Sequence, residues 1–358
     1  MVETIGKPSP PPETPPPAAP LPAAGDLPRW HGDGLIARSV RFALTVMAPI
    51  VCGLVVGVDT WMIYAMLTCI LGFTLDKGGP VLERLVWIGA AGVVVLAGTG
   101  IGTLVAHHTG LVILAFALAG ALYALVESID AGAAAAARFL CLTLAVGALY
   151  APVQPLDLPV VAGFVLYAWL VSLGWDVAVR LWRPSAAPDP RALLARLRAT
   201  ERERWIFAGA VAISVPLALF TSLALGLHRP YWALIAIVLV LRADSLASRQ
   251  LMRQQILGTL LGILAALAFG FLFTAHAALL TGMAVAALLR WPAQQLNGTL
   301  GAAALTAFIM LLLEVVAGGV GGAARDIVER LVDVMVGCVF AFVALELDRL
   351  GQRLLRRR

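Results

Sequence analysis

Charge is scarce in this sequence of 358 residues: only 13% are Asp, Glu, Lys or Arg, whereas 61% are hydrophobic. Soluble domains average about 25% charged and about 45–50% apolar residues. A chain with half that charge lacks the polar surface of a globule in water, so a soluble enzyme is excluded. The apolar residues form continuous runs, without the alternation over about ten residues that outer-membrane strands show. The composition therefore predicts an all-α polytopic membrane protein.

Cysteine is also rare, and the catalytic and metal-binding signatures are missing. The four cysteines, Cys52, Cys69, Cys141 and Cys338, all lie within apolar runs, so we expect small buried side chains and neither disulfides nor a metal site. No zinc-finger spacing and no basic soluble face occurs, and nucleic acid is not an expected partner. Paired aspartates, a Gly-x-Ser-x-Gly turn and a His-Glu-x-x-His helix are absent. We expect neither an enzyme nor a bound cofactor.

Proline is concentrated at one place, because ten of the 21 prolines occur in residues 1–30. This predicts an extended, solvated tail over residues 1–37. A bilayer core of roughly 30 Å needs about 20 helical residues, and we predict about twelve transmembrane helices. The second, eighth and tenth are short, so the sequence does not decide whether they cross the whole bilayer. The predicted spans are 39–57, 59–75, 84–106, 109–127, 134–151, 158–181, 204–226, 229–242, 252–274, 276–290, 298–316 and 326–348.

The 26 basic residues, of which only two are lysines, predict the orientation. With a cytoplasmic N-terminus and twelve alternating segments, 23 of them lie on the cytoplasmic side, and Arg229, Arg325 and Arg330 lie on the other. This distribution follows the positive-inside rule. The basic linker 183–203 is then cytoplasmic, either as an amphipathic helix on the inner leaflet or as a solvated connector. The Arg-rich tail 351–358 is cytoplasmic as well.

The chain repeats itself in outline. Trp61 aligns with Trp232, and Arg84 aligns with Arg253 at nearly the same offset. Each half carries six predicted helices, an even number, so both halves enter the membrane from the same side. The sequence therefore predicts two parallel six-helix repeats. The repeats comprise residues 38–182 and 204–350.

Four segments carry a family resemblance: DKGGPVLER before the third helix, HRPYWALIAIVLVLR, RQQILGTLLG and RDIVERLVDVMVG. In these segments the chain resembles the fusaric-acid-resistance (FUSC) family, the aromatic acid exporters, over roughly residues 38–350. The resemblance implies a bacterial inner-membrane protein that exports aromatic carboxylic acids, with a distant similarity to plant malate-conducting channels. Larger family members carry a substantial cytosolic domain between the halves, whereas this chain has only a short linker.

Aromatic residues next to arginine are the first candidates for substrate binding. An aromatic carboxylate needs a cation for its charge and a flat wall for its ring. Arg229, Tyr231 and Trp232 supply both within one hairpin, and Trp61 is the counterpart of Trp232 in the first half. Aromatic anchoring at the membrane interface is the alternative explanation of the same residues.

Ionisable residues at or within the helices are the second set of candidates. Arg84 and Arg253 lie at the cytoplasmic ends of the third and ninth predicted helices. Their charge would either attract an anion from the cytoplasm or simply anchor the helix ends according to the positive-inside rule. Arg330 and Asp333 lie near the start of the last helix, where each charge costs roughly 2.5–3.5 kcal/mol on insertion scales. Structural pairing at i,i+4 spacing, Arg325 with Glu329 and Asp326 with Arg330, is one explanation of the charges at this helix start. Arg330 with Asp333 is the candidate for the pore or for a proton step.

Two local patterns predict structural contacts. Asp176 is expected to pair with Arg180, one helical turn further on. Glycines at four-residue spacing predict that the helices carrying them approach a neighbour closely. These glycine pairs are Gly53/Gly57, Gly98/Gly102 and Gly258/Gly262.

The expected function is efflux of small organic anions, aromatic carboxylates in particular, across the inner membrane. Membrane potential, a proton gradient or both would drive it, since moving one charge through 100 mV is worth about 2.3 kcal/mol. A channel-like anion pore and a non-transporting component of a larger efflux assembly are the alternatives. Besides the bilayer and the anion, a second copy of the chain and a periplasmic efflux partner are open as partners.

Overall fold

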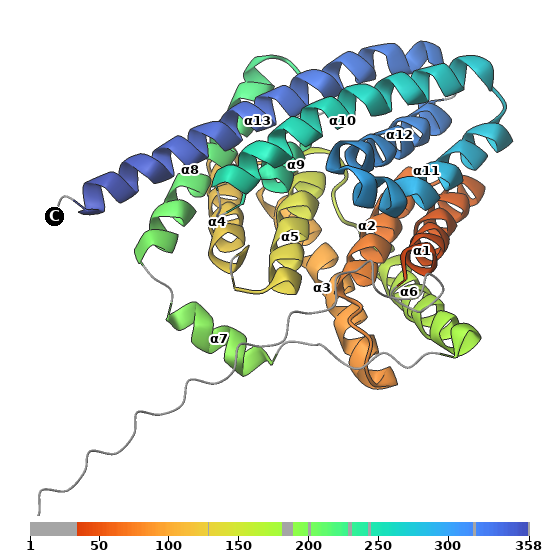
Figure 1. Cartoon of the computed structure of the whole chain (residues 1–358), viewed down its shortest axis with the longest axis horizontal. Helices are drawn as coiled ribbons and strands as arrows, with labels where there is room; N and C mark the ends of the chain where they lie inside the picture. Colours follow the sequence, from red (N-terminus) through yellow and green to blue (C-terminus); the bar gives the residue numbers. More distant parts are fainter. Residues whose placement is uncertain are drawn as a thin grey trace, which may run out of the picture.

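The structure, a computed structural model, describes residues 34–127, 129–180, 189–199, 202–227, 231–242, 245–317 and 320–356. Within these ranges it contains thirteen α-helices and no strand (Figure 1). Each of the twelve predicted segments coincides with one helix, and α7 lies in the predicted linker, so the all-helical class is confirmed. The helices are α1 (Leu35–Val56), α2 (Asp59–Leu75), α3 (Val81–Val105), α4 (Thr109–Glu127), α5 (Ala131–Leu149), α6 (Asp157–Val179), α7 (Pro190–Arg198), α8 (Arg202–Ala224), α9 (Tyr231–Val240), α10 (Ser245–Leu272), α11 (His276–Leu296), α12 (Gly298–Ala317) and α13 (Val320–Arg356).

Helix length and composition identify a multi-pass membrane protein. Within the described ranges, eight helices are long and apolar enough to cross a bilayer: α1, α3, α4, α5, α6, α8, α10 and α12. Two more, α2 and α9, are apolar but shorter. The last helix was expected to end at residue 348 and instead continues to Arg356, because its leucine, glutamine and arginine residues are good helix formers.

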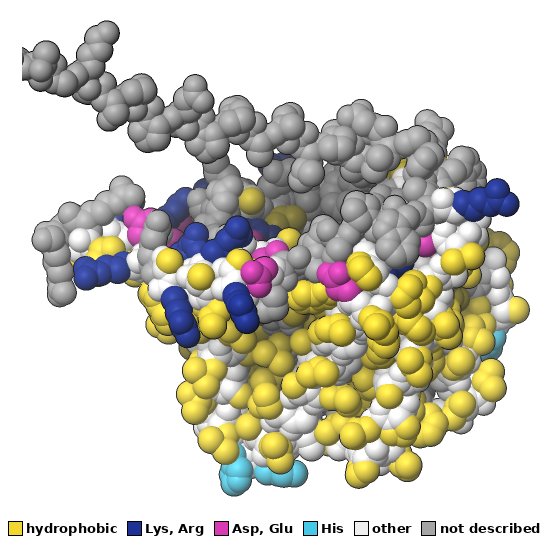
Figure 2. All heavy atoms as spheres, turned by 90° about the horizontal axis from the view of Figure 1, so that it is seen from below, with side chains coloured by type: hydrophobic (Ala, Val, Ile, Leu, Met, Phe, Trp, Pro, Cys, Tyr) yellow, Lys and Arg dark blue, Asp and Glu magenta, His cyan; other side chains and the backbone are white. Residues whose placement is uncertain are grey.

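The surface is divided into polar and apolar zones. Large apolar side chains such as Leu82, Leu104 and Val177 are exposed on the outside of the bundle. On the face shown in Figure 2, Lys, Arg, Asp and Glu side chains gather at one end, an apolar band covers the rest, and histidines lie at the opposite end. An apolar belt between polar ends is the surface that a bilayer requires.

Glycines allow two helix pairs to pack closely, α3 with α5 and α10 with α12. A Cβ atom added at Gly102 would collide with the backbone of Leu144 and Ala148, and one at Gly262 with the backbone of Ala303. The predicted close approach of these helices is confirmed. The pair Gly53/Gly57 behaves differently: Gly53 packs against Met62, whereas Gly57 ends α1 in the left-handed region at φ 73°.

The two largest apolar cores combine residues of both halves of the sequence. One core combines apolar residues of α4 and α5 with those of α8, α9 and α13, and a second combines α1 and α2 with α10, α11 and α12. Helices of the two halves meet at two places, because α4 packs on α8 and α1 packs on α11. The short helix α9 lies at this junction and contacts α5, α8, α10 and α13.

Candidate functional site

The start of α9 carries a cluster of aromatic rings with a buried arginine on one of them. The guanidinium of Arg330, from α13, lies 3.7 Å from the centre of the Trp232 ring. Tyr231 lies against Trp232 with ring centres 5.3 Å apart, and Tyr150, which caps α5, lies 5.7 Å from Tyr231. We call Tyr150, Tyr231, Trp232, Arg330 and Asp333 the Arg330 cluster. It joins residues of both halves of the chain.

Burial makes the charges of this cluster costly. Arg330 is 3% exposed and Asp333 is fully buried. Nε and Nη1 of Arg330 and both carboxylate oxygens of Asp333 have no hydrogen-bond partner among the described residues. An unpaired charge in an apolar interior is strongly unfavourable unless a partner is supplied. The cluster thus holds donors of Arg330 and acceptors of Asp333 that no described residue uses, beside an indole ring.

Close packing holds α13 against α9 at this place. A Cβ atom at Gly337 would collide with Ala233 and Ala236 of α9. Glycine at this position lets the two backbones approach, as in other membrane helix pairs. The geometry that sets Arg330 over Trp232 is therefore fixed by the helix pair and not by a loop.

The other end of α9 carries a second cluster, which we call the Arg138 cluster: Tyr123, Glu127, Arg138 and Arg242. The Tyr123 hydroxyl donates to the carbonyl of Leu241 at 2.5 Å, and Nη1 of Arg242 donates to the same carbonyl at 2.7 Å. These bonds satisfy a carbonyl at the end of α9, where no helical partner remains. Arg138 of α5 lies with its guanidinium 5.3 Å from the Tyr123 ring centre.

Arg84 belongs to a separate, neutralised network. Its Nη1 donates to Asp176 at 2.7 Å, its Nε donates to Asp76 at 3.3 Å, and its Nη2 donates to Ser172. Arg41 pairs with Asp76 at 3.5 Å, so two guanidinium groups face two carboxylates. The sequence suggested Arg180 as the partner of Asp176, and the structure instead gives it Arg84, 92 residues away.

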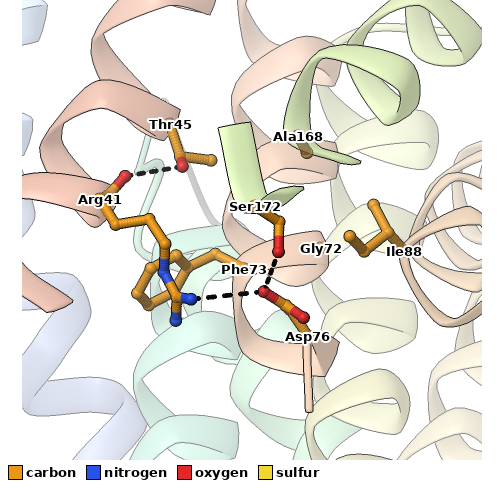
Figure 3. Close-up of a pocket in the computed structure, with 8 residues that line it drawn as sticks. All are labelled: Arg41, Thr45, Gly72, Phe73, Asp76, Ile88, Ala168 and Ser172. Carbon is orange, nitrogen blue, oxygen red and sulfur yellow. Dashed lines mark hydrogen bonds and ion pairs between the residues drawn. The ribbon is translucent and has the colours of Figure 1, made fainter. Parts of the chain in front are cut away.

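A small pocket opens beside this network, between α1, α2, α3 and α6 (Figure 3). Asp76 accepts hydrogen bonds from Ser172 and from the backbone N–H of Gly78. Because the charges compensate one another, the network is suited to holding helix ends together rather than to binding an anion. Its lining comprises Arg41, Thr45, Gly72, Phe73, Asp76, Ile88, Ala168 and Ser172.

The remaining candidates lie apart from these clusters. Trp61 is partly buried in α2, and Arg253 is exposed near the start of α10. Arg229 lies outside the described residues. Arg84 and Arg253, matched in the sequence, therefore occupy different surroundings. In the part of the chain that the structure describes, no group of His, Cys, Asp or Glu side chains is arranged to hold a metal ion.

Several arginine–aromatic contacts were not predicted from the sequence. One is Arg138 with Tyr123, described above. Another is at Trp291 of α11, which has Arg38 of α1 at 3.8 Å and its neighbour Arg290 at 5.5 Å from its ring centre. The pairs Arg138 with Tyr123 and Arg38 with Trp291 join different helices, so no local spacing predicts them. The one signal in the sequence is the isolated arginine that follows an alanine run at Arg138.

The span-length helices and the apolar surface between polar ends define a multi-pass helical membrane protein. Residues 217–344 match the model of a family described as fusaric acid resistance protein-like, which confirms the family resemblance. The matched segment contains all of α9 and the α13 residues of the Arg330 cluster. No curated protein and no solved structure matches the chain.

Proposed function

We propose that this protein exports small organic anions, aromatic carboxylates in particular, across a bacterial inner membrane. The observation that carries the proposal is the buried Arg330 guanidinium on the Trp232 ring, with Nε and Nη1 unpartnered among the described residues. A carboxylate fits those donors, and its aromatic ring fits the Tyr231 and Trp232 faces. The positive end of the α9 dipole adds to the attraction.

The proposed architecture is twelve crossings in two parallel six-helix repeats with both termini in the cytoplasm. Its support is the basic side chains that gather at one end of the molecule (Figure 2). A second support is that equivalent helix pairs meet in both halves, α3 with α5 and α10 with α12, and α2 with α6 and α9 with α13. The site lies where the halves meet.

Transport by liposomes containing the purified protein tests this function. Labelled benzoate uptake is measured at neutral pH for the wild type and for Arg330→Gln, with malate as a non-aromatic competitor. Removing a charge-assisted donor pair costs about 1.5–3 kcal/mol, so we expect Arg330→Gln to lower uptake at least about tenfold. Arg330→Lys keeps the positive charge without the planar donors, so its uptake is expected to lie between that of the wild type and that of Arg330→Gln.

Arg353→Gln is the matched control, since Arg353 is an exposed arginine on the same helix, and its uptake should equal that of the wild type. Size-exclusion profiles and thermal melts in detergent establish that each variant is folded. Wild-type uptake no faster than that of protein-free liposomes rejects transport. If Arg330→Gln is folded and its uptake equals that of the wild type, the Arg330 cluster is not the substrate-binding site.

A further inference from the structure

Both ends of α9 carry an arginine set on an aromatic ring. Trp232 with Arg330 lies at its start, and Tyr123 with Arg138 lies beside its end. Ten residues of helix span about 15 Å, so the two clusters are separated by much less than the thickness of a bilayer core. The first cluster includes Tyr150 of the first half, and the second joins α4 and α5 to the end of α9. Both clusters therefore lie along the contact between α5 and α9.

The Arg138 cluster has more positive than negative charge. Arg242 pairs with Glu127 at 3.7 Å and donates to the Tyr123 hydroxyl at 3.1 Å. Arg138 lies with its guanidinium 5.3 Å from the Tyr123 ring centre, and its buried Nε has no hydrogen-bond partner among the described residues. No ion pair to Arg138 is present within those residues. Two guanidinium groups against one tyrosine repel one another, and a bound carboxylate would relieve the repulsion.

The two clusters differ in exposure. Arg330 and Asp333 are buried, whereas Arg138 retains part of its exposed surface. In this conformation a solute reaches Arg138 more readily than Arg330. By the proposed orientation, the Arg138 cluster lies at the cytoplasmic end, where an exported anion is loaded.

We propose that the Arg138 cluster is a second anion-binding site, which takes an aromatic carboxylate from the cytoplasmic side and passes it along α9 to the Arg330 cluster. The inference rests on the proposed function and adds the loading site to it. Arg138 binds the carboxylate, Tyr123 supports its ring, and Arg242 acts as a positioning residue that fixes Tyr123 and the end of α9.

Two measurements on the full chain test this site. Calorimetric titration of detergent-solubilised protein with benzoate is expected to give two equivalents for the wild type and one for Arg138→Gln. Export in inside-out vesicles is expected to show a KM raised at least tenfold in Arg138→Gln, with a maximal rate within twofold of the wild type. Arg330→Gln, by contrast, should lower the maximal rate. If Arg138→Gln does not fold, Arg138→Lys replaces it in these measurements, since lysine keeps the positive charge. Its KM should be raised by a smaller factor than that of Arg138→Gln.

The outcomes separate this inference from the proposed function. If the wild type transports benzoate and folded Arg138→Gln shows an unchanged KM and the same number of bound equivalents, the Arg138 cluster is not a loading site, and the proposed transport function is retained. If the wild type binds benzoate in an Arg138-dependent manner and transports nothing, the proposed transport function is wrong, and the anion-binding site is retained. The exposed-arginine variant Arg353→Gln should match the wild type in both measurements.

Discussion

Individual buried arginines in this protein differ in what surrounds their charge. Arg84 has Asp76 and Asp176 within ion-pair distance, so its charge is compensated within the fold. Arg330 lies near Asp333 without an ion pair within 4.0 Å and lies instead on a tryptophan ring. The first arrangement is that of a structural tie between helices, and the second leaves donors for a ligand.

This difference predicts that Arg84 is needed for stability. In Arg84→Gln, Asp176 loses its 2.7 Å ion pair and Asp76 loses its 3.3 Å ion pair. Breaking one side of a buried ion pair costs about 3–5 kcal/mol, so a large drop in melting temperature in detergent is expected. Adding Asp176→Asn to Arg84→Gln should restore part of the loss, because it removes the buried negative charge that Arg84 compensates in the wild type. A melting temperature equal to that of Arg353→Gln would contradict the structural role.

At the same scale, the sequence identified residues but not their partners. Tyr231 and Trp232 were selected for their aromatic rings, and Arg330 and Asp333 for their charge, without a contact between the two sets. Their meeting depends on the packing of α13 on α9, about 100 residues apart, which no local spacing encodes. The partner of Asp176 was missed for the same reason, since an i,i+4 rule finds only neighbours on one helix.

Among the helices, each segment predicted from an apolar run coincides with one helix of the structure, because a run of apolar residues must be helical to satisfy its backbone in lipid. The ends of the helices were predicted less accurately. The start of α10 lies seven residues before the expected residue 252, since its first turns carry polar residues that the hydrophobicity criterion excludes. The linker helix α7 is polar, so the hydrophobicity criterion does not detect it either.

Glycine packing predicts an element-scale effect with an internal control. Gly102→Val places a side chain against the backbone of α5, where no neighbour is a flexible side chain that can move aside. Overpacking costs about 1–3 kcal/mol, and a clear fall in melting temperature in detergent is expected. Gly100→Val, on the same helix with nothing within 4 Å of the added Cβ, should melt close to the wild type. Equal melting of the two variants would show that α3 and α5 are not held together at this point.

For the whole molecule, the decisive feature is that the two largest cores combine residues of the two halves. The sequence predicted two parallel six-helix repeats, and it contained no information on which of their helices meet. With α4 on α8 and α1 on α11, the contact between halves runs through the interior, and α9 lies within it. The proposed anion route follows this contact, between the two arginine–aromatic clusters.

The most direct test of anion transport uses the membrane potential alone. Liposomes containing the protein are given a potential of 100 mV, positive inside, by a K⁺ gradient and valinomycin, with equal pH on both sides. Since 100 mV is worth about 2.3 kcal/mol per charge, labelled benzoate should accumulate toward roughly fiftyfold over the outside and leave when the potential is collapsed. Accumulation equal to that of protein-free liposomes, with or without the potential, would contradict the account.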